Sequence, residues 1–444
     1  MRRTLIEETV LMASVAKWIV LATIAGAAVG VATAVFLHLL SMAVNATGRY
    51  PYAFLFLPAA FFLSSLLIRY LAPDAEGHGT EKVIEAVHKS NGNIPLAVVP
   101  VKLLATIITL AFGGSAGKEG PCAQIGAGIC SWMSRIMKFN EDDRKKLVIC
   151  GISAGFAAVF GTPIAGAIFG VEVLFVGSIL YDVLLPSFIA GITSYQIASW
   201  MGIPYLRIPM VIMPDVNQLM MLKIIASVFA FGILSRLLIL GLKIGHRCSS
   251  AIRIWKPGKA LIGGFTMVLL ALLFGRTWLG LGIESIDSAL GGAIASWYTP
   301  LLKILFTSVT LSLGGSGGIV TPIFFIGATG GSALAALLRF DPVALSAVGF
   351  VSLLAGAANT PIAASIMAVE LFGPSIGPYA AVACVVSFIV SGHRSVYPSQ
   401  ILAVKKSPSL ATEIGRDMAS VRTMYLKKWW TRLWRSGKGR KHQS

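Results

Sequence analysis

Residues 113–121 read Gly-Gly-Ser-Ala-Gly-Lys-Glu-Gly-Pro, and apolar stretches flank this run on both sides. An ionisable side chain is costly to keep among glycines at membrane depth, so its default role there is in an ion pathway. The run returns in altered form at residues 314–328, GGSGGIVTPIFFIGA, which match residues 113–127 at eight of fifteen positions. This stretch therefore indicates both where the function lies and how the chain is built.

Two further elements recur in the same order. Residues 162–172 (TPIAGAIFGVE) match residues 360–370 (TPIAASIMAVE) at seven of eleven positions, and Gly77-His78-Gly79 pairs with Gly280-Leu281-Gly282. The three offsets are 201, 198 and 203 residues, so chance similarity between glycine-rich segments is a poor explanation. We predict two homologous halves, residues 15–205 and 206–405, between a short N-terminal segment, 1–14, and a basic tail, 406–444.

The composition is that of a membrane protein. Of the 444 residues, 56% are hydrophobic and only 13% are charged, which excludes an ordinary soluble domain and predicts an all-α polytopic membrane protein. The candidate spans are 18–40, 52–72, 96–112, 147–160, 163–180, 184–201, 222–244 and 260–279. Several, such as 147–160, are shorter than the about 20 residues that cross a bilayer, so tilted and broken helices are expected.

The distribution of charge predicts how the halves are oriented. One loop of the second half carries Lys243, His246, Arg247, Arg253, Lys256 and Lys259, whereas the corresponding stretch of the first half, about 40–55, has only Arg49. Equivalent loops should therefore face opposite sides of the membrane, as in the inverted repeats of transporters. In such folds, broken helices point their N-termini at the transported ion. Because those ends carry partial positive charge, the ion should be an anion.

The net charge of +18 does not indicate nucleic-acid binding, because much of it lies in loops and in the tail. From Lys405 onward, eleven basic residues stand against two acids. The basic N-terminus and tail predict that both termini are cytoplasmic, with the inner membrane of a prokaryote as the expected location. Residues 421–434 alternate Trp with Lys and Arg, as an interfacial helix would. The five cysteines lack metal-binding spacing, so no metal or other cofactor is expected.

The motifs resemble those of the CLC family of chloride channels and proton/chloride exchangers, over about residues 15–405. Residues 117–121 (GKEGP) are similar to the family's G-[KR]-E-G-P signature, and residues 318–322 (GIVTP) to its G-x-F-x-P. Tyr397 looks like its ion-coordinating tyrosine. Residues 77–80 (GHGT) occupy the place of its G-S-G-I-P.

This resemblance implies a CLC-type fold of two inverted repeats and a homodimer with one pore in each subunit. It implies transport of a small anion, with chloride as the expected cargo and protons as a possible second one, and no enzymatic activity. By the resemblance Glu119 is the gate, and the anion site draws on His78, Gly79, Lys118, Gly120, Ile319, Val320, Thr321 and Tyr397.

The chemistry of Glu119 supports a gate without the family. A carboxylate at a positive helix terminus mimics an anion, so protonation or competition by anions can free the site. The alternative is an acid that caps the first helical turn and moves nothing. The second half keeps the glycines but has Val320 at the position of Glu119. Capping is therefore not a general need of this turn.

Other members of the implied site also have simpler interpretations. The Tyr397 hydroxyl can donate a hydrogen bond to an anion, but tyrosines are also common at membrane interfaces, where they act as anchors. Ile319 and Val320 can offer backbone N–H groups to the anion, or they can be ordinary apolar residues of the core or lipid face. Without the resemblance, the sequence leaves both questions open.

Three departures from the family pattern affect selectivity and coupling. His78 stands where a serine usually coordinates the central anion, so its imidazole either donates to the ion or turns toward water. Thr80 and Glu81 replace the motif's Ile and Pro. Relatives that handle fluoride or nitrate also vary at this serine, so fluoride and nitrate remain alternatives to chloride.

The third departure concerns protons. Val173 stands where proton-coupled members carry an internal glutamate, directly after the acid at Glu172. Glu172 and its repeat mate Glu370 can still pass protons through water. Their duplication favours a shared architectural role instead, such as hydrogen bonding to a helix end at a contact between the halves. A channel or weakly coupled exchanger is therefore the expected mechanism, and a strictly coupled antiporter is the alternative.

Other function classes have weaker support. The run at 113–117 fits G-x-S-x-G, the nucleophile motif of serine hydrolases, but so does 314–318, and a hydrolase needs only one such serine. A duplicated serine is better explained as a small residue that lets helices approach closely. A cation transporter would need several buried acids or unwound carbonyls, whereas these helix starts present donors.

Overall fold

The computed structural model describes residues 2–205, 218–408, 410–421 and 424–425. The first half contains α1 (Arg2–Gly48), α2 (Leu57–Leu71), α3 (Thr80–Lys89), α4 (Val98–Ala111), α5 (Glu119–Ile136), α6 (Glu141–Phe160), α7 (Pro163–Glu172) and α8 (Tyr181–Trp200). The second half contains α9 (Gln218–Ala251), α10 (Lys256–Phe274), α11 (Ile283–Leu290), α12 (Thr299–Ser312), α13 (Val320–Leu338), α14 (Pro342–Ala358), α15 (Pro361–Phe372) and α16 (Gly377–Ser391).

Regular structure outside these helices is short. Three 3-10 turns occur, η1 (Ala53–Phe56), η2 (Pro73–Ala75) and η3 (Pro374–Ile376), along with two-residue strands β1 (Phe175–Val176), β2 (Ile401–Leu402), β3 (Leu410–Ala411) and β4 (Met424–Tyr425). Strand β1 pairs in parallel with β2, and β3 pairs antiparallel with β4. The all-α membrane fold predicted from the sequence is therefore present.

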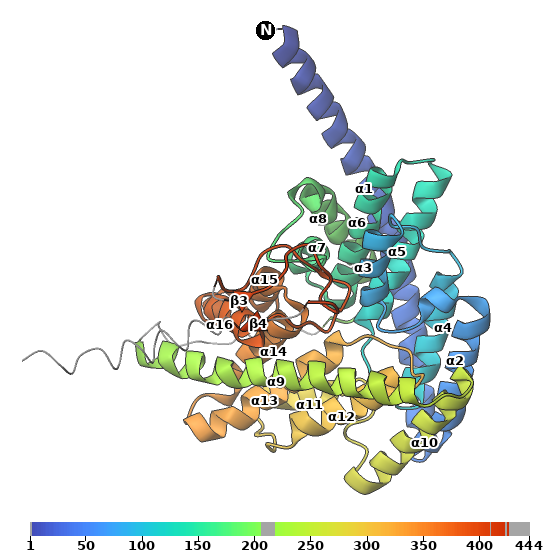
Figure 1. Cartoon of the computed structure of the whole chain (residues 1–444), viewed down its shortest axis with the longest axis vertical. Coiled ribbons are helices and arrows are strands. Elements are labelled where there is room, and N and C mark those ends of the chain that lie inside the picture. Colours follow the sequence, from blue (N-terminus) through green and yellow to red (C-terminus); the bar gives the residue numbers. More distant parts are fainter. Residues whose placement is uncertain (1, 206–217, 409, 422–423, 426–444) are drawn as a thin grey trace, which may run out of the picture.

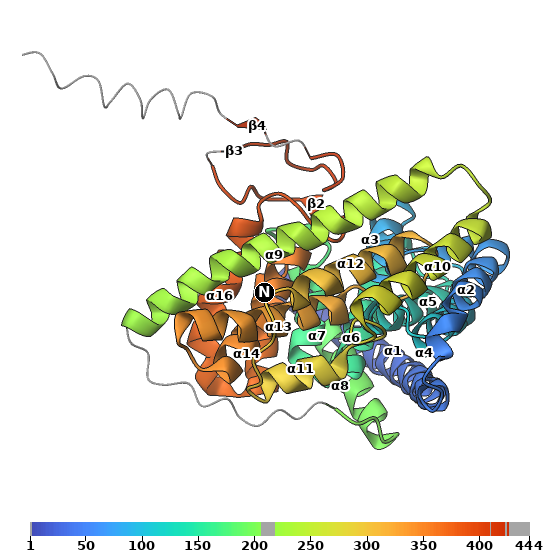
Figure 2. The same cartoon turned by 90° about the horizontal axis from the view of Figure 1, so that it is seen from below.

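The helices of the first half gather at the top and right of Figure 1, and those of the second half at the bottom and left. The N-terminal part of α1 projects beyond this body, and the long α9 runs across the second half in both views (Figures 1 and 2). Six helices of the described residues are long and apolar enough to cross a membrane. Several others, including α7 and α15, are short apolar helices of 10–17 residues.

The expectation of broken helices holds, although several predicted spans were wrong in length: 18–40 and 222–244, for example, lie within the longer helices α1 and α9. The predicted short span 147–160 is the C-terminal part of α6, which begins earlier, at Glu141, and has 20 residues. Asn140 caps it by accepting a hydrogen bond from the Asp143 N–H, so three acidic residues belong to its first turn. The predicted span 163–180 is shorter than expected, because α7 ends at Glu172 and β1 follows.

The repeat appears in space as a set of matched hydrogen bonds between the halves. The Ser115 N–H donates to Thr310 Oγ1 at 3.1 Å, and the Ser316 N–H donates to Thr109 Oγ1 at 3.0 Å. The hydroxyl of each serine also lies 3.1–3.2 Å from a second threonine hydroxyl, that of Thr307 or Thr106. Each serine thus binds the opposite half, a role more specific than that of a small packing residue.

Glu172 and Glu370 form a second reciprocal contact. The Glu172 carboxylate accepts the N–H groups of Ile362 and Ala363 at 3.0 and 2.8 Å, at the start of α15. The Glu370 carboxylate accepts those of Ile164 and Ala165 at 3.0 and 2.8 Å, at the start of α7. These are the helix-end hydrogen bonds between the halves that the sequence predicted. Each acid therefore supplies the acceptor for N–H donors that a helix N-terminus otherwise leaves unpaired.

The predicted interfacial helix at 421–434 lies almost wholly outside the described residues. Within it, Met424–Tyr425 form strand β4, so the helix prediction was wrong at these two positions. The division between the halves at 205/206 falls at the edge of a segment, 206–217, that the structure does not describe.

Replacing Glu370 with Ala should destabilise the protein by about 1–3 kcal/mol, because the N–H donors of Ile164 and the buried Ala165 at the start of α7 lose their acceptor. We expect a lower melting temperature for the purified variant in detergent. Glu284→Ala is the matched control, since that side chain is exposed in the first turn of α11. Equal melting temperatures for Glu370→Ala and wild type would contradict this role.

Candidate functional site

The two glycine-rich runs meet at the centre of the contact between the halves. The Gly117 N–H donates to the Gly318 carbonyl at 2.7 Å, and the Gly318 N–H donates back to the Gly117 carbonyl at 2.6 Å. This pair forms an isolated antiparallel bridge. Helices α5 and α13 begin immediately after it, at Glu119 and Val320. The two helix N-termini that were predicted to face an anion therefore begin beside one another.

The Glu119 side chain crosses from the first half to the start of α13. Its carboxylate accepts the Thr321 hydroxyl at 2.5 Å and the Thr321 N–H at 3.1 Å. Glu119 is 1% exposed and Thr321 is 4% exposed. A helix N-terminus is a site for anions, and here a carboxylate of the same chain occupies it. Glu119 is therefore bonded to the opposite half, while its own backbone N–H at the start of α5 also acts on the carboxylate.

The other predicted members on these two helices surround this bond. Lys118 directly precedes α5 with a partly exposed side chain, and its charge acts on Glu119. Ile319 and Val320 are each 1% exposed at the start of α13. Their side chains therefore belong to the protein interior, which excludes the lipid-facing alternative for both.

Close backbone contacts bring the loop before α3 against this centre. Gly79 has φ +78°, and a Cβ at this position would overlap the backbone of Gly120. A Cβ at Gly120 would in turn overlap the His78 carbonyl oxygen. Only glycine fits both places without displacement. The predicted residues Gly79 and Gly120 are thus brought together, and they bring His78 to the start of α5.

Tyr397 approaches the same region from the C-terminal part of the chain. The side chain is fully buried, so an interfacial anchor is excluded. Its hydroxyl has no hydrogen-bond partner at normal geometry among the described residues, although it interacts with Thr80 and with the charge of Glu119. A buried phenol without a partner has a free donor for an anion or water.

His78 is 5% exposed, so the alternative in which its ring turns to bulk water does not fit. Neither ring nitrogen has a hydrogen-bond partner at normal geometry within the described ranges, although the Val396 backbone lies near the ring. The ring faces that of His246 on α9, with 5.9 Å between centroids. In the sequence His246 stands out only as part of a basic loop, and no pattern there indicates this contact with His78.

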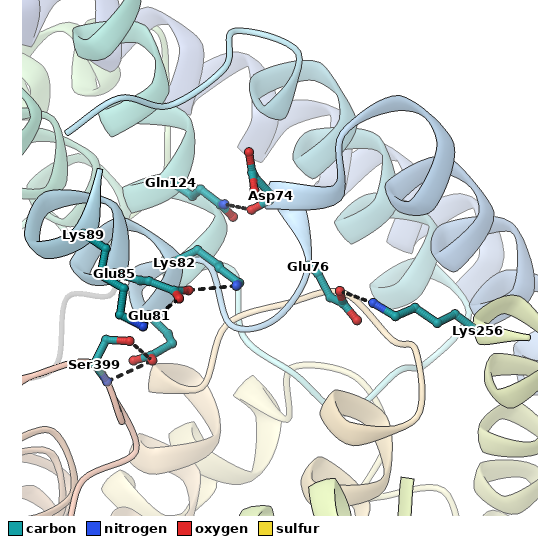
Figure 3. Close-up of polar contacts among 9 residues, drawn as sticks. All are labelled: Asp74, Glu76, Glu81, Lys82, Glu85, Lys89, Gln124, Lys256 and Ser399. Carbon is teal, nitrogen blue, oxygen red and sulfur yellow. Dashed lines mark hydrogen bonds and ion pairs between the residues drawn. The ribbon is translucent and has the colours of Figure 1, made fainter. Parts of the chain in front are cut away.

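His246 lines a cavity of about 570 Å³ that extends to Gly77, the residue directly before His78. Its charged lining is mostly basic, with Arg69, Lys256 and Lys259 beside Glu76, and its glycine lining includes Gly77, Gly314 and Gly315. Lys256 pairs with Glu76 at 2.8 Å, as Figure 3 shows. A cavity with this excess of cations concentrates small anions at its mouth.

Two buried lysines were also missed. Lys102 on α4 donates to the carbonyls of Ala75 and Gly77 at 3.0 and 2.7 Å. Lys303 on α12 donates to those of Trp278 and Gly280 at 3.2 and 2.8 Å. Both are 0% exposed, and they are repeat mates 201 residues apart. A lysine at the same place in both halves was the signal that could have identified them.

A sequence model of the voltage-gated chloride channel family matches residues 59–392, most of the chain. The protein belongs to this CLC family. Among curated proteins, the chain is 36% identical over 402 residues to a chloride/fluoride channel protein of Pseudomonas syringae pv. tomato, covering 89% of this chain and 88% of that protein. It is 26% identical to the voltage-gated ClC-type chloride channel ClcB of Salmonella dublin, covering 72% and 79%.

Solved structures agree with this assignment. A CLC-type fluoride/proton antiporter superposes with a TM-score of 0.83 at 28% identity, covering 87% of this chain and 98% of that one. A slow cyanobacterial Cl⁻/H⁺ antiporter superposes with a TM-score of 0.72 at 20% identity, covering 84% and 94%, which supports the fold alone. The chain is thus an integral membrane protein of a family of anion channels and transporters.

Gly120→Ala should reduce anion flux at least about tenfold, because a methyl group forced into this packed contact costs about 1–3 kcal/mol of strain. The measurement is anion efflux from vesicles that contain equal amounts of folded protein. Gly48→Ala is the control, since a Cβ there meets nothing within 4 Å. Normal flux through Gly120→Ala would contradict the close approach of His78 to α5.

Proposed function

We propose that this CLC protein transports fluoride in preference to chloride and exchanges it for protons, with Glu119 as the gate. One observation carries the proposal: a carboxylate occupies the helix N-terminus at which an anion would bind. An anion and the charged carboxylate compete for the same donors. A proton neutralises the carboxylate and removes it as a competitor, so proton binding and anion binding become linked at one site.

The choice of fluoride rests on two further observations. His78 stands in place of the serine expected from the family pattern. The similar proteins include a chloride/fluoride channel protein at 36% identity and a fluoride/proton antiporter at 28%. Fluoride holds its hydration shell more strongly than chloride does, so a selective path must present strong donors. The Thr321 hydroxyl and N–H, released when Glu119 moves, are such donors.

The membrane orientation and assembly belong to the same proposal. We assign the basic cavity at His246 to the cytoplasmic side, because Arg69, Lys256 and Lys259 line it and cytoplasmic loops are enriched in such residues. By the same rule both termini are cytoplasmic, in the plasma membrane of a bacterium. A homodimer is expected from the family.

A passive chloride pathway is the second candidate function. Val173, which is fully buried, stands where coupled relatives carry an internal glutamate. Glu172, the acid beside it, has both carboxylate oxygens bonded to the start of α15. A role for Glu172 in proton transfer therefore stays a prediction, because proton uptake would have to disturb the two hydrogen bonds that its carboxylate accepts from α15.

The two candidates are separated by flux measurements on vesicles that contain the wild-type protein. An outward fluoride or chloride gradient is imposed, the membrane potential is clamped with potassium and valinomycin, and external anion and pH are recorded together. We expect uphill proton movement driven by fluoride, and fluoride efflux at least about tenfold faster than chloride efflux, equivalent to about 1.4 kcal/mol of discrimination. Vesicles without protein control for leakage of hydrogen fluoride. Equal or faster chloride flux without proton movement would support the passive pathway instead.

Glu119→Gln should abolish proton coupling and flatten the pH dependence of anion flux, because an amide cannot take up the proton that displaces the gate. Initial efflux rates across a pH series measure both effects, and Glu119→Ala should behave in the same way. Glu284→Gln, at an exposed position of α11, is the control. An unchanged pH profile in Glu119→Gln would rule out Glu119 as the gate.

A further inference from the structure

We propose that Glu81, in the first turn of α3, is the carboxylate that passes protons between the cytoplasmic side and Glu119. This inference rests on the proposed proton coupling and deepens it. It addresses a gap in the chain itself, because Val173 cannot carry a proton and both oxygens of Glu172 are already bonded to helix α15.

Glu81 is positioned by the segment that carries Tyr397. Its Oε1 accepts the Ser399 N–H at 3.0 Å and the Ser399 hydroxyl at 2.6 Å, as Figure 3 shows. These two bonds fix the carboxylate against Ser399, which lies two residues after Tyr397 in the sequence. Its other oxygen, Oε2, is buried and has no hydrogen-bond partner in the part of the chain that the structure describes. One oxygen therefore orients the group, while the other is left free to take up a proton.

Two hydroxyl groups lie on the inner side of Glu81. Thr80 is its neighbour in the chain, is 1% exposed and interacts with the Tyr397 hydroxyl. The same phenol interacts electrostatically with both Glu81 and Glu119. Both carboxylates therefore lie within electrostatic range of this phenol, whose oxygen can accept one proton while it donates another.

The outer side of Glu81 leads to the surface of the protein. On the same helix, Lys82 and Glu85 form an ion pair at 2.8 Å, and the exposed Lys89 also pairs with Glu85, at 3.1 Å. These charges bind one another, which leaves Glu81 as the acid of α3 that turns inward. From the elements packed against α3, the charge of Glu119 at the start of α5 acts on the same phenol as Glu81, and Lys145 on α6 acts on His88 of α3.

The C-terminal segment connects this region to the cytoplasmic side. Ser399 is followed by β2, and the Met418 N–H donates to the Gln400 carbonyl at 2.8 Å. The segment at 400–418 therefore folds back beside Ser399, and the basic tail follows it. Because basic tails remain cytoplasmic, Glu81 lies between this side and the site.

Each transfer changes only O–H bonds. Glu81 takes up one proton from cytoplasmic water at Oε2. It releases that proton to the chain of hydroxyls formed by Thr80 and Tyr397 or to water beside them, and the last member releases one proton to the Glu119 carboxylate. Glu81 and Tyr397 then have their initial protonation, and Glu119 has gained one proton. No other reactant is required.

The test measures anion and proton flux separately in vesicles for wild type and Glu81→Gln. Glutamine keeps an oxygen that can accept from Ser399 but cannot release a proton. We expect anion flux within about twofold of wild type and proton flux reduced at least about tenfold, a loss of about 1.4 kcal/mol or more in the transfer step. Glu81→Asp should restore part of the proton flux.

Two controls separate proton transfer from structure. Glu85→Gln removes an acid of the same helix that already pairs with lysines, and it should keep full coupling. Ser399→Ala removes the hydroxyl that orients Glu81 but leaves its carboxyl group, so it should retain most of the proton flux. If Ser399→Ala and Glu81→Gln lost coupling equally, Glu81 would act only through its bond to Ser399, and the inference would be wrong.

The remaining outcomes are also distinct. Full coupling in Glu81→Gln would overturn the inference and leave the proposed exchange intact. Loss of anion flux together with proton flux in a folded Glu81→Gln protein would make Glu81 part of the anion path and would likewise overturn it. A wild-type protein that moves no protons would overturn both proposals.

Discussion

The reciprocal hydrogen bonds between Gly117 and Gly318 are the contact on which the rest of the site depends. They join the two halves by their backbones, two residues before α5 and α13 begin. Two backbones can exchange N–H···O bonds in this way only if no side chain intervenes, so the glycines of both runs are a geometric requirement. Once the bridge is formed, the N-termini of two helices from separate halves start at one place.

This arrangement explains how the site can attract an anion without a free buried cation at its centre. The bridge brings the donors of α13 to the Glu119 carboxylate, and that carboxylate is bound across the contact. The lysines behind the paired loops, Lys102 and Lys303, bind backbone carbonyls. They hold the loops in shape, while the basic cavity at His246 adds positive charge at the mouth.

The sequence predicted those features that leave a pattern along the chain. Three features could be inferred because matched residues recur at nearly constant spacing: the repeat, the broken helices, and the capping of helix starts in the opposite half by Glu172 and Glu370. Contacts between residues without such a pattern could not. His246 faces His78 from a helix some 170 residues later, and Ser399 binds Glu81 across 318 residues. Helix lengths also differed, as for α6, because Asn140 allows charged residues to extend an apolar segment.

The reciprocal caps at Glu172 and Glu370 also constrain how the chain is made. The N–H groups that Glu172 binds belong to residues synthesised 190 positions later, about 10–40 seconds later at typical bacterial and eukaryotic rates of translation. The start of α7 likewise lacks its acceptor until Glu370 has left the ribosome. During that interval the first half lies in the bilayer with unpaired polar groups that only the second half can satisfy. Neither half is therefore a self-sufficient unit of biosynthesis, although the two share a repeated sequence pattern.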